Sequence, residues 1–314
     1  MPGRRRVILD CDPGHDDAMA ILLAAASPAL ELQAITTVAG NQTLDKVTLN
    51  ARRVCSVAGI DGVPIAAGCD RPLTRERIVA GDIHGSSGLD GVDWDEPVVG
   101  LDARHAVDLI TELAAADDRR PLTIVAVGPL TNVATALRDA PQIAARIDRI
   151  SIMGGAIGLG NRTPSAEFNI YVDPEAAEIV FASGVPITLV PLEVTHQAVA
   201  TDAVLARIAG LDTPVARMSV ALLRFFADTY ERVFGFAAPA VHDPCAVAAV
   251  IDPSLVPARH VNVAIDTISE LSLGRTVCDV HGTTGRPPNA DVGLALDVDR
   301  FWTLMLGALE SYRT

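Results

Sequence analysis

Four aspartates stand within eight residues near the start of the chain, directly after a short apolar run. The run 7–9 favours a buried strand, Pro13-Gly14 favours a turn, and the alanine- and leucine-rich segment behind them favours a helix. A helix N-terminus favours one or two carboxylates, but four would repel each other unless a divalent cation lay among them. The alternative is a capped helix behind an acidic turn. The four residues are Asp10, Asp12, Asp16 and Asp17.

Composition limits the partners and the compartment. The 314-residue chain is 49% hydrophobic, which is enough to bury a large core. Its 25 basic and 39 acidic residues give a formal charge of −14, which argues against nucleic acid or an anionic membrane as a partner. Five scattered cysteines without a CxxC pair are typical of a reducing compartment. The apolar stretch 18–26 is too short to span a bilayer. We expect a soluble, cytoplasmic protein.

Buried strands alternate with helices along most of the chain, without a linker-like segment or a repeat. Alternation of this kind predicts an α/β fold, a doubly wound domain over residues 1–314 with a mainly parallel central sheet. Extra C-terminal strands are expected at 261–265, 276–280 and 292–296. The main strands are expected at 31–38, 63–66, 122–127, 149–153 and 187–191, with helices at 43–58, 105–115 and 173–182.

Two segments stand apart from this alternation. Residues 68–101 form a long irregular stretch, and a loop of that length in a compact domain is usually functional or disordered. We interpret it as lid-like, with His84 over a substrate; the alternative is a solvated histidine. Residues 201–236 carry two helical patterns and are expected on the substrate side.

Polar clusters follow several of the predicted strands. They are the aspartates, Asn41, the segment 128–131 and the loop 154–169. In doubly wound sheets, ligands bind outside the carboxyl ends of the strands, so we expect the active site at that edge. The glycines of 154–160 lack the GxGxxG spacing before a helix, so they are a weak phosphate signal.

The aspartates are expected to divide their roles. Asp16 and Asp17 point about 100° apart on a helix, so one is expected to bind the metal and the other something beside it. Asp12, just before the turn, is placed to complete the ligand set or to orient a water. The pair His242-Asp243, before a proline, offers a further carboxylate at a second helix start. The alternative for that pair is an ordinary helix cap.

The loop after 154 suggests a sugar site. Glu167 and Asn169 lie two residues apart in a segment expected to be locally extended, which would put both side chains on one face. With Asn161 they offer donors and acceptors suited to a polyhydroxyl ligand. The alternative is that the asparagines cap their own loop.

Taken together, these motifs resemble the inosine-uridine-preferring nucleoside hydrolase family, the metal-dependent N-ribohydrolases. The resemblance covers nearly the whole chain, and the ordered series of motifs makes coincidence implausible. It rests on the segments 10–17, 34–41, 83–85, 128–132, 153–155, 166–170 and 241–244.

The resemblance implies a bound Ca²⁺ and a ribose site. The calcium ligands would be Asp12, Asp17, Asp243 and the main-chain carbonyl of Val127. The 2′,3′-diol of the ribose would be held by Asp16, Asn41 and Asn169, and the 5′-hydroxyl by Asn161 and Glu167. Asp10 would support the cluster from behind. The family resemblance also implies a homodimer or homotetramer.

The implied reaction breaks the C1′–N bond of a ribonucleoside through an oxocarbenium-like state. Calcium would orient and acidify a water, and Asp12 would accept its proton as the water attacks C1′. His242 is the candidate acid for the leaving purine, and His84 would contact the base from the lid. Phe226 and Tyr230 are expected near the base. We predict hydrolysis of both uridine and inosine, in a role in nucleoside salvage.

Two other interpretations stay open at this point. A haloacid-dehalogenase-like phosphatase also has an Asp-x-Asp motif after its first strand, as in Asp10 to Asp12. Its chemistry needs a later lysine, however, and Lys46 stands at the wrong distance along the chain. A calcium-dependent ribose-binding protein without catalysis is the third interpretation, and the presence of Asp12 and His242 argues against it.

Overall fold

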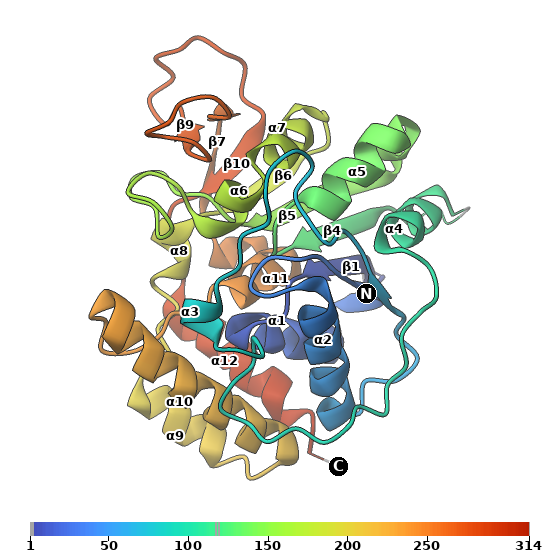
Figure 1. Ribbon diagram of the computed structural model, residues 1–314, viewed down its shortest axis with the longest axis vertical. Coiled ribbons are helices and arrows are strands. Elements are labelled where there is room, and N and C mark those ends of the chain that lie inside the picture. Colours follow the sequence, from blue (N-terminus) through green and yellow to red (C-terminus); the bar gives the residue numbers. More distant parts are fainter. Residues whose placement is uncertain (1–2, 117, 119, 314) are drawn as a thin grey trace.

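The computed structural model describes residues 3–116, 118 and 120–313. Within them, eight strands form the central sheet (Figure 1), in the order β3-β2-β1-β4-β5-β6-β10-β7. Neighbouring strands are parallel except β10 and β7, which are antiparallel. The predicted α/β class with a mainly parallel sheet is therefore confirmed. The strands are β1 (Arg5–Cys11), β2 (Leu30–Thr37), β3 (Ile65–Ala67), β4 (Leu122–Ala126), β5 (Ile147–Met153), β6 (Ile187–Val190), β7 (Ala258–Val261) and β10 (Ala290–Gly293).

Helices cover both faces of the sheet, because successive side chains of a strand point to opposite sides. Val7 and Leu9 of β1 pack into one buried core, and Ile8 packs into the other. The first core is covered by α1 (His15–Ala26), α2 (Leu44–Ala58), α11 (Asp243–Ile251) and α12 (Val298–Glu310), and the second by α4 (Ala106–Ala115), α5 (Thr131–Asp139) and α7 (Pro174–Ala182).

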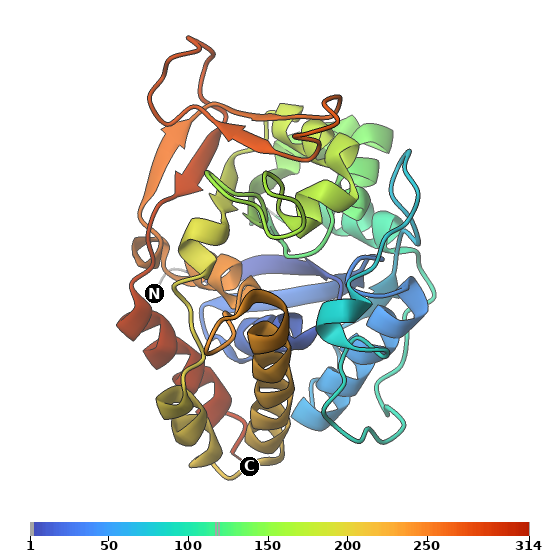
Figure 2. The ribbon, with the colours of Figure 1, turned by 60° about the vertical axis from the view of Figure 1, so that its left-hand side comes forward.

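Two further helices, α9 (Asp202–Ala209) and α10 (Pro214–Phe234), pack outside the first layer against α12 and α1 (Figure 2). The boundaries of α10 follow local chemistry. The Thr213 side chain accepts a hydrogen bond from the Ala216 amide, Pro214 occupies the first helical position, and Gly235 ends the helix with a φ of 70°. The long helix carries Phe226 and Tyr230 toward the carboxyl edge of the sheet.

The C-terminal strands differ from the predicted ones. The segment expected as one strand at 261–265 is divided, because β7 ends at Val261 in the central sheet and β8 (Val263–Ile265) begins a separate pair. β8 pairs antiparallel with β9 (Thr276–Cys278). Extra C-terminal strands are thus present, but they belong to two sheets.

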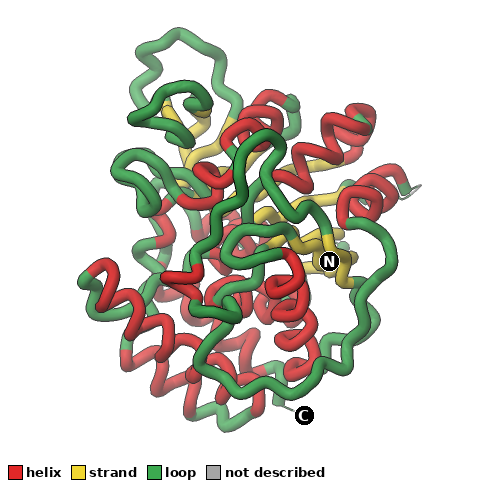
Figure 3. Tube along the Cα trace, viewed as in Figure 1, coloured by secondary structure: helices red, strands yellow, loops and turns green. Residues whose placement is uncertain are grey.

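The segment 68–101 is largely irregular and crosses the molecule beside α2 and α10 (Figure 3). It contains the four-residue helix α3 (Gly81–His84), which contacts α10. Three more short elements were not predicted: α6 (Phe168–Val172), α8 (Leu192–Thr195) and the 3₁₀ turn Pro141–Arg146. Because α6 begins at Phe168, the expected extended conformation of 167–169 is wrong.

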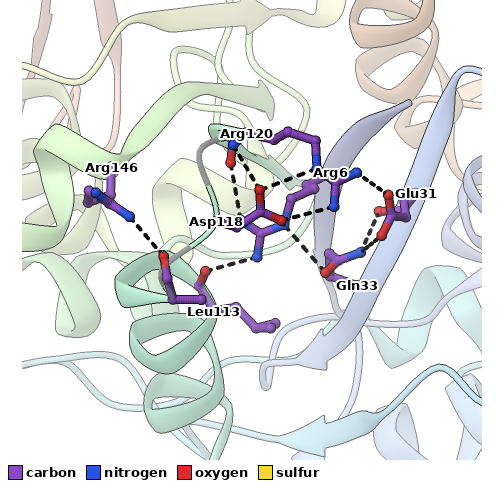
Figure 4. A network of polar contacts seen from close by, with 8 residues as sticks. Arg6, Glu31, Gln33, Leu113, Asp118, Arg120 and Arg146 are labelled. Carbon is purple, nitrogen blue, oxygen red and sulfur yellow. Dashed lines mark hydrogen bonds and ion pairs between the residues drawn. The ribbon is translucent and has the colours of Figure 1, made fainter. Parts of the chain in front are cut away.

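A polar network closes the opposite, amino-terminal end of the sheet (Figure 4). The Arg6 side chain is buried and donates hydrogen bonds to the carbonyls of Leu113 and Arg120, at 3.1 and 3.2 Å. Asp118 forms ion pairs with both arginines. The network joins the start of β1 to α4 and to the segment before β4, away from the polar clusters. Among the described helices, none is long and apolar enough to cross a membrane.

Candidate active site

The predicted site residues gather at one cavity, at the carboxyl ends of β1, β2, β4 and β5. Its volume is about 290 Å³, close to the lower end for small-molecule pockets. Asp12 and Asp17 do not line the cavity themselves, but both contact Asn41, which does. The predicted residues that line it are Asp16, Asn41, His84, Val127, Asn161, Glu167, Asn169, Phe226, Tyr230, His242 and Asp243.

Two helix N-termini bring carboxylates together at the floor of the site. Asp16 and Asp17 lie in the first turn of α1, and Asp243 begins α11. Carboxylate oxygens of these three buried residues all lie within 4.8 Å of one another. Asp17 accepts hydrogen bonds from the Gly14 and Asp12 amides, at 2.9 and 3.1 Å. The fold therefore supplies a cluster of carboxylate oxygens to which Asp16 contributes as well as Asp17 and Asp243.

Asp12 faces the same cluster from the end of β1. Its Oδ2 accepts a 2.6 Å hydrogen bond from the Asn41 amide. Its Oδ1 is buried and has no hydrogen-bond partner in the described part of the chain. Burial and the charge of Asp17 raise the pKa of the Asp12 carboxyl well above its usual value. A buried carboxylate oxygen without a partner is costly unless a cation or a proton occupies it.

Two glycines make room for Asp12. A Cβ on Gly40 would lie 2.2 Å from Asp12 Oδ2, and one on Gly128 would lie 2.6 Å from Oδ1. Gly40 follows the end of β2 by three residues and Gly128 follows the end of β4 by two, so both lie at the carboxyl edge of the sheet. Their lack of a side chain is thus what lets the carboxylate reach this position.

The donor set fits a hard divalent cation. Burial and the charge of Asp17 raise the pKa of Asp16 to about 7, and burial also raises the pKa of Asp17 and Asp243. Negatively charged carboxylates repel each other in a buried cluster. A cation that takes oxygen ligands, such as Ca²⁺, stabilises them.

The Val127 carbonyl and Asn169 form the next part of the wall. Asn169 Nδ2 donates to the Val127 carbonyl at 2.8 Å and to the Met153 carbonyl at 3.2 Å. A carbonyl oxygen has two lone pairs, so Val127 keeps capacity for a second partner. These contacts fix the amide of Asn169 between the ends of β4 and β5.

Glu167 is fixed by the helix that it caps. Its carboxylate accepts hydrogen bonds from the amides of Gly155, Asn169 and Ile170, at 2.9, 2.9 and 3.2 Å. Burial raises the Glu167 pKa to about 7 despite these donors. Asn161 Oδ1 accepts from the Phe168 amide at 2.9 Å, so this asparagine does cap its own loop while also lining the cavity.

His242 lies between two hydroxyl groups. Its Nε2 is 2.5 Å from the Tyr230 hydroxyl, and its Nδ1 is 2.7 Å from Thr195 Oγ1. The Phe226 ring packs edge-on against Tyr230, with ring centres 4.6 Å apart. Burial lowers the His242 pKa to about 3, so the free site holds this imidazole neutral. Its main-chain amide donates to Asp16 at 3.2 Å, which links this end of the cavity to the aspartates.

His84 is buried in α3 rather than solvated, and its ring stacks with Phe226 and His15. At the mouth of the cavity, Asp82 of the same short helix forms a 3.7 Å ion pair with Arg162. The segment 68–101 therefore contributes one wall of the site and a contact across its opening.

Comparison with known proteins identifies the family. The sequence profile described as inosine-uridine preferring nucleoside hydrolase matches residues 7–303. The chain belongs to this family. It is 48% identical over 307 residues to the inosine-uridine preferring nucleoside hydrolase of Crithidia fasciculata, which covers 98% of each chain. It is 46% identical over 310 residues to the pyrimidine-specific ribonucleoside hydrolase RihA of Shewanella sp. strain MR-7, covering 98% of this chain and 97% of that one.

A solved structure of a nucleoside hydrolase also matches this chain. The purine-preferring ribonucleoside hydrolase from Gardnerella vaginalis matches this nucleoside hydrolase with a TM-score of 0.91 and 32% identity, over 98% of this chain and 99% of that one. The predicted family and enzyme class, a glycosidase acting on N-glycosyl compounds, are therefore confirmed.

Membership of a family of ribonucleoside hydrolases excludes the phosphatase and the non-catalytic binding protein. The contacts of Lys46 and Asp10 also argue against the phosphatase. Lys46 donates to the Ser86 carbonyl at 2.6 Å, so it is not held at Asp10 as phosphatase chemistry requires. Asp10 lies apart from the aspartate cluster: Thr36 and Asn132 both donate to its Oδ1, at 2.6 and 2.8 Å. In this nucleoside hydrolase, Asp10 joins β1 to β2 and α5.

Sequence reasoning missed several residues of the hydrolase site. Thr195 contacts His242 from α8, and no motif marked it. His15 stood inside the opening motif but received no role, although it contacts His84. Ile83, Phe168 and Phe234 also line the cavity as apolar walls. The helical spacing from Tyr230 to Phe234 was the one signal that could have indicated the last of these.

Proposed function

We propose that this nucleoside hydrolase uses Ca²⁺ to cleave the N-glycosidic bond of both uridine and inosine, giving the free base and ribose. The observation that carries the proposal is the buried Oδ1 of Asp12, which has no partner among the described residues and lies beside carboxylates of the same charge. The names of the similar proteins support a ribonucleoside substrate and include both inosine-uridine preferring and pyrimidine-specific enzymes.

Asp12, Asp17, Asp243 and the Val127 carbonyl would hold the ion. When bound, Ca²⁺ supplies Lewis-acid polarisation that lowers the pKa of a water. Asp16 lies in the same cluster of oxygens and also lines the cavity, so it can turn an oxygen toward a ribose hydroxyl.

Asp12 is the proposed general base. The attacking water gives its oxygen to C1′ and a proton to Asp12, while the C1′–N electron pair leaves with the base. Oδ2 of Asp12 is held by the Asn41 amide, and Oδ1 accepts no hydrogen bond from the described residues, so the carboxylate keeps lone pairs for the ion and for that proton. Carboxylates around the ring stabilise the positive charge that develops on the sugar.

The ribose would be oriented by polar groups that the fold has already fixed. Asp16, Asn41 and Asn169 are placed for the 2′,3′-diol, and Asn161 and Glu167 for the 5′-hydroxyl. The Glu167 carboxylate accepts three hydrogen bonds and the Asn169 side chain donates two to main-chain carbonyls, so little ordering is left for the substrate to bring about.

The departing base would take a proton from the hydrogen-bonded pair His242 and Tyr230. Both groups are buried at the end of the cavity walled by Phe226, and the Tyr230 oxygen lies 2.5 Å from Nε2 of His242, so the two can share a proton. His84 lines the same end of the cavity and would contact the base.

The test follows base and ribose release from uridine and inosine, with p-nitrophenyl phosphate as the control substrate. We expect both nucleosides to be hydrolysed, phosphate release to be absent, and Asp12→Asn to abolish turnover while leaving the fold intact by circular dichroism. Turnover of guanosine or adenosine with uridine untouched would contradict the proposed substrate range. The homodimer or homotetramer, the cytoplasmic location and the role in nucleoside salvage stay predictions.

A further inference from the structure

We propose that His15 is a positioning residue that fixes the tautomer of His84, so that His84 presents a hydrogen-bond acceptor, Nε2, to the substrate. His15 is the first residue of α1 and lies directly before the aspartates of the cluster. It is fully buried, and its ring stacks between Phe225 and Phe226, with centre separations of 5.1 Å to each.

The tautomer of His15 follows from its partner. Its Nε2 lies 2.9 Å from the main-chain carbonyl of Asp90. A carbonyl oxygen only accepts hydrogen bonds, so Nε2 of His15 carries the proton. In a neutral imidazole the other nitrogen, Nδ1, is then an acceptor.

The tautomer of His84 follows in turn. Its Nδ1 lies 3.1 Å from Nδ1 of His15, and two acceptors at that distance would repel each other. Nδ1 of His84 therefore carries a proton and donates it to His15. The main-chain amide of His15 also directs its N–H at Nδ1 of His84, at 3.4 Å, and only an unprotonated Nδ1 could accept it. The contact between the two rings is shorter, at 3.1 Å, and we assign the proton by that contact. The opposite assignment would require both His15 nitrogens to be protonated, which places a charge between two phenyl rings where no carboxylate of the described residues accepts a hydrogen bond from it.

The residues around the His84 ring leave room for this contact. A Cβ on Gly14 would lie 2.6 Å from Nδ1 of His84, so the glycine before His15 is what allows the approach. Asp90, whose carbonyl holds His15, also accepts hydrogen bonds at its carboxylate from the Ser86 and Ser87 amides. His15 thus joins α1 to the turn behind His84, and the position of His84 depends on it.

The consequence lies at the other edge of the His84 ring. Nε2 makes no hydrogen bond to any described residue, and the ring lines the cavity. With Nδ1 protonated, Nε2 can only accept. His84 would therefore recognise a donor on the substrate, and the ring N–H beside a carbonyl that uracil (N3) and hypoxanthine (N1) share is the donor class that fits a base contact.

Nitrogen-15 NMR of the histidine-labelled protein tests the tautomers directly, with His84→Gln used to assign the His84 signals. We expect a protonated Nδ1 and a bare Nε2 for His84, and the reverse for His15. His15→Leu keeps an apolar group between the phenyl rings and should shift His84 toward a tautomer mixture. The matched variant His281→Leu, at an exposed position, should leave the His84 signals unchanged. A His84 protonated at Nε2, or a His15 protonated at both nitrogens, would overturn the proposal, and this wild-type result stands even if His15→Leu fails to fold.

An activity measurement tests the recognition and rests on the proposed function. Uridine is compared with 3-methyluridine, which lacks the imide N–H. We expect the wild type to prefer uridine, and His15→Leu to lower the ratio of the two kcat/KM values by about three- to tenfold, the size of one lost hydrogen bond. An unchanged ratio would overturn the recognition step. Absence of uridine turnover in the wild type would instead count against the proposed function, and the NMR result would be unaffected.

Discussion

The Tyr230 hydroxyl lies 2.5 Å from Nε2 of His242, although the two residues come from different helices on the same side of the sheet. On its other side, His242 contacts Thr195, so both ring nitrogens have hydroxyl partners. The orientation of His242 is therefore fixed before any substrate binds, and neither contact could be inferred from the His-Asp motif alone.

Tyr230→Phe tests the role of this pair. Removing the hydroxyl leaves the aromatic packing against Phe226 in place but removes the partner of His242 Nε2. We expect kcat for inosine to fall by about 100-fold, as for loss of a general acid, with a smaller change in KM. Steady-state kinetics measures this. Tyr312→Phe is the matched control, because its hydroxyl donates to the Leu22 carbonyl away from the site. Equal kcat values for Tyr230→Phe and the wild type would contradict the assignment.

Gly40→Ala tests the close approach of Asp12. The new Cβ would lie 2.2 Å from Asp12 Oδ2, so the carboxylate must move. We expect about 1–3 kcal/mol lower unfolding free energy from overpacking and about 100-fold lower kcat from misplacement of the base. Urea denaturation and uridine kinetics measure the two effects. Gly307→Ala is the control, because Gly307 lies inside α12 and a Cβ added there would have no atom within 4 Å apart from the backbone of its own helix and its chain neighbours. It should be neutral or slightly stabilising, and a fully active Gly40→Ala would count against the account.

The contribution of Glu167 and Asp16 to the stability of the chelator-treated protein should fall as pH rises from 6.5 to 8. Burial raises the Glu167 pKa to about 7 and, with the charge of Asp17, the Asp16 pKa to about 7, so the folded state binds more protons than the unfolded state in this window. The contribution of the two carboxylates to the unfolding free energy then decreases with pH, by about 1 kcal/mol for Glu167 alone. Burial lowers the folded-state pKa of His15, His84, His196 and His242, and these residues release protons from the unfolded state near pH 6.5, so their contribution has the opposite sign. The share of Glu167 is therefore measured as the difference between the wild type and Glu167→Gln.

Thermal unfolding at pH 6.5, 7.2 and 8 measures this trend. Glu167→Gln should remove its share of the slope without changing the histidines. The same pH dependence in the wild type and in Glu167→Gln would show that Glu167 is ionised in the folded protein without a metal. Added calcium should weaken the trend, because it favours the ionised carboxylates.

The sequence predicted the fold and the edge that holds the site because strand periodicity and the polar residues after each strand are local patterns. The division between β7 and β8 could not be predicted, because the alternation of apolar and polar residues continues through Val261, Asn262 and Val263 while the chain changes sheets. The conformation of 167–169 was wrong for a related reason. Spacing by two suggests an extended chain, but Glu167 turns back to cap α6, and its carboxylate satisfies the helix amides.

Contacts between segments far apart in the sequence could not be predicted either. Thr195 meets His242 across 47 residues, and His15 meets His84 across 69, so no local pattern carries either contact. The roles divided among the aspartates were only partly predictable. Helix geometry separated Asp16 from Asp17, yet the fold brings oxygens of both to within 4.8 Å of Asp243.

The most direct test of the central claim is the hydrolysis of uridine by protein stripped with a calcium chelator and then resupplied with calcium. We predict that turnover disappears on stripping and returns in proportion to the calcium bound, with one ion per chain at full activity. Asp12→Asn should stay inactive at every calcium concentration. Full activity in the stripped wild-type protein would contradict the account.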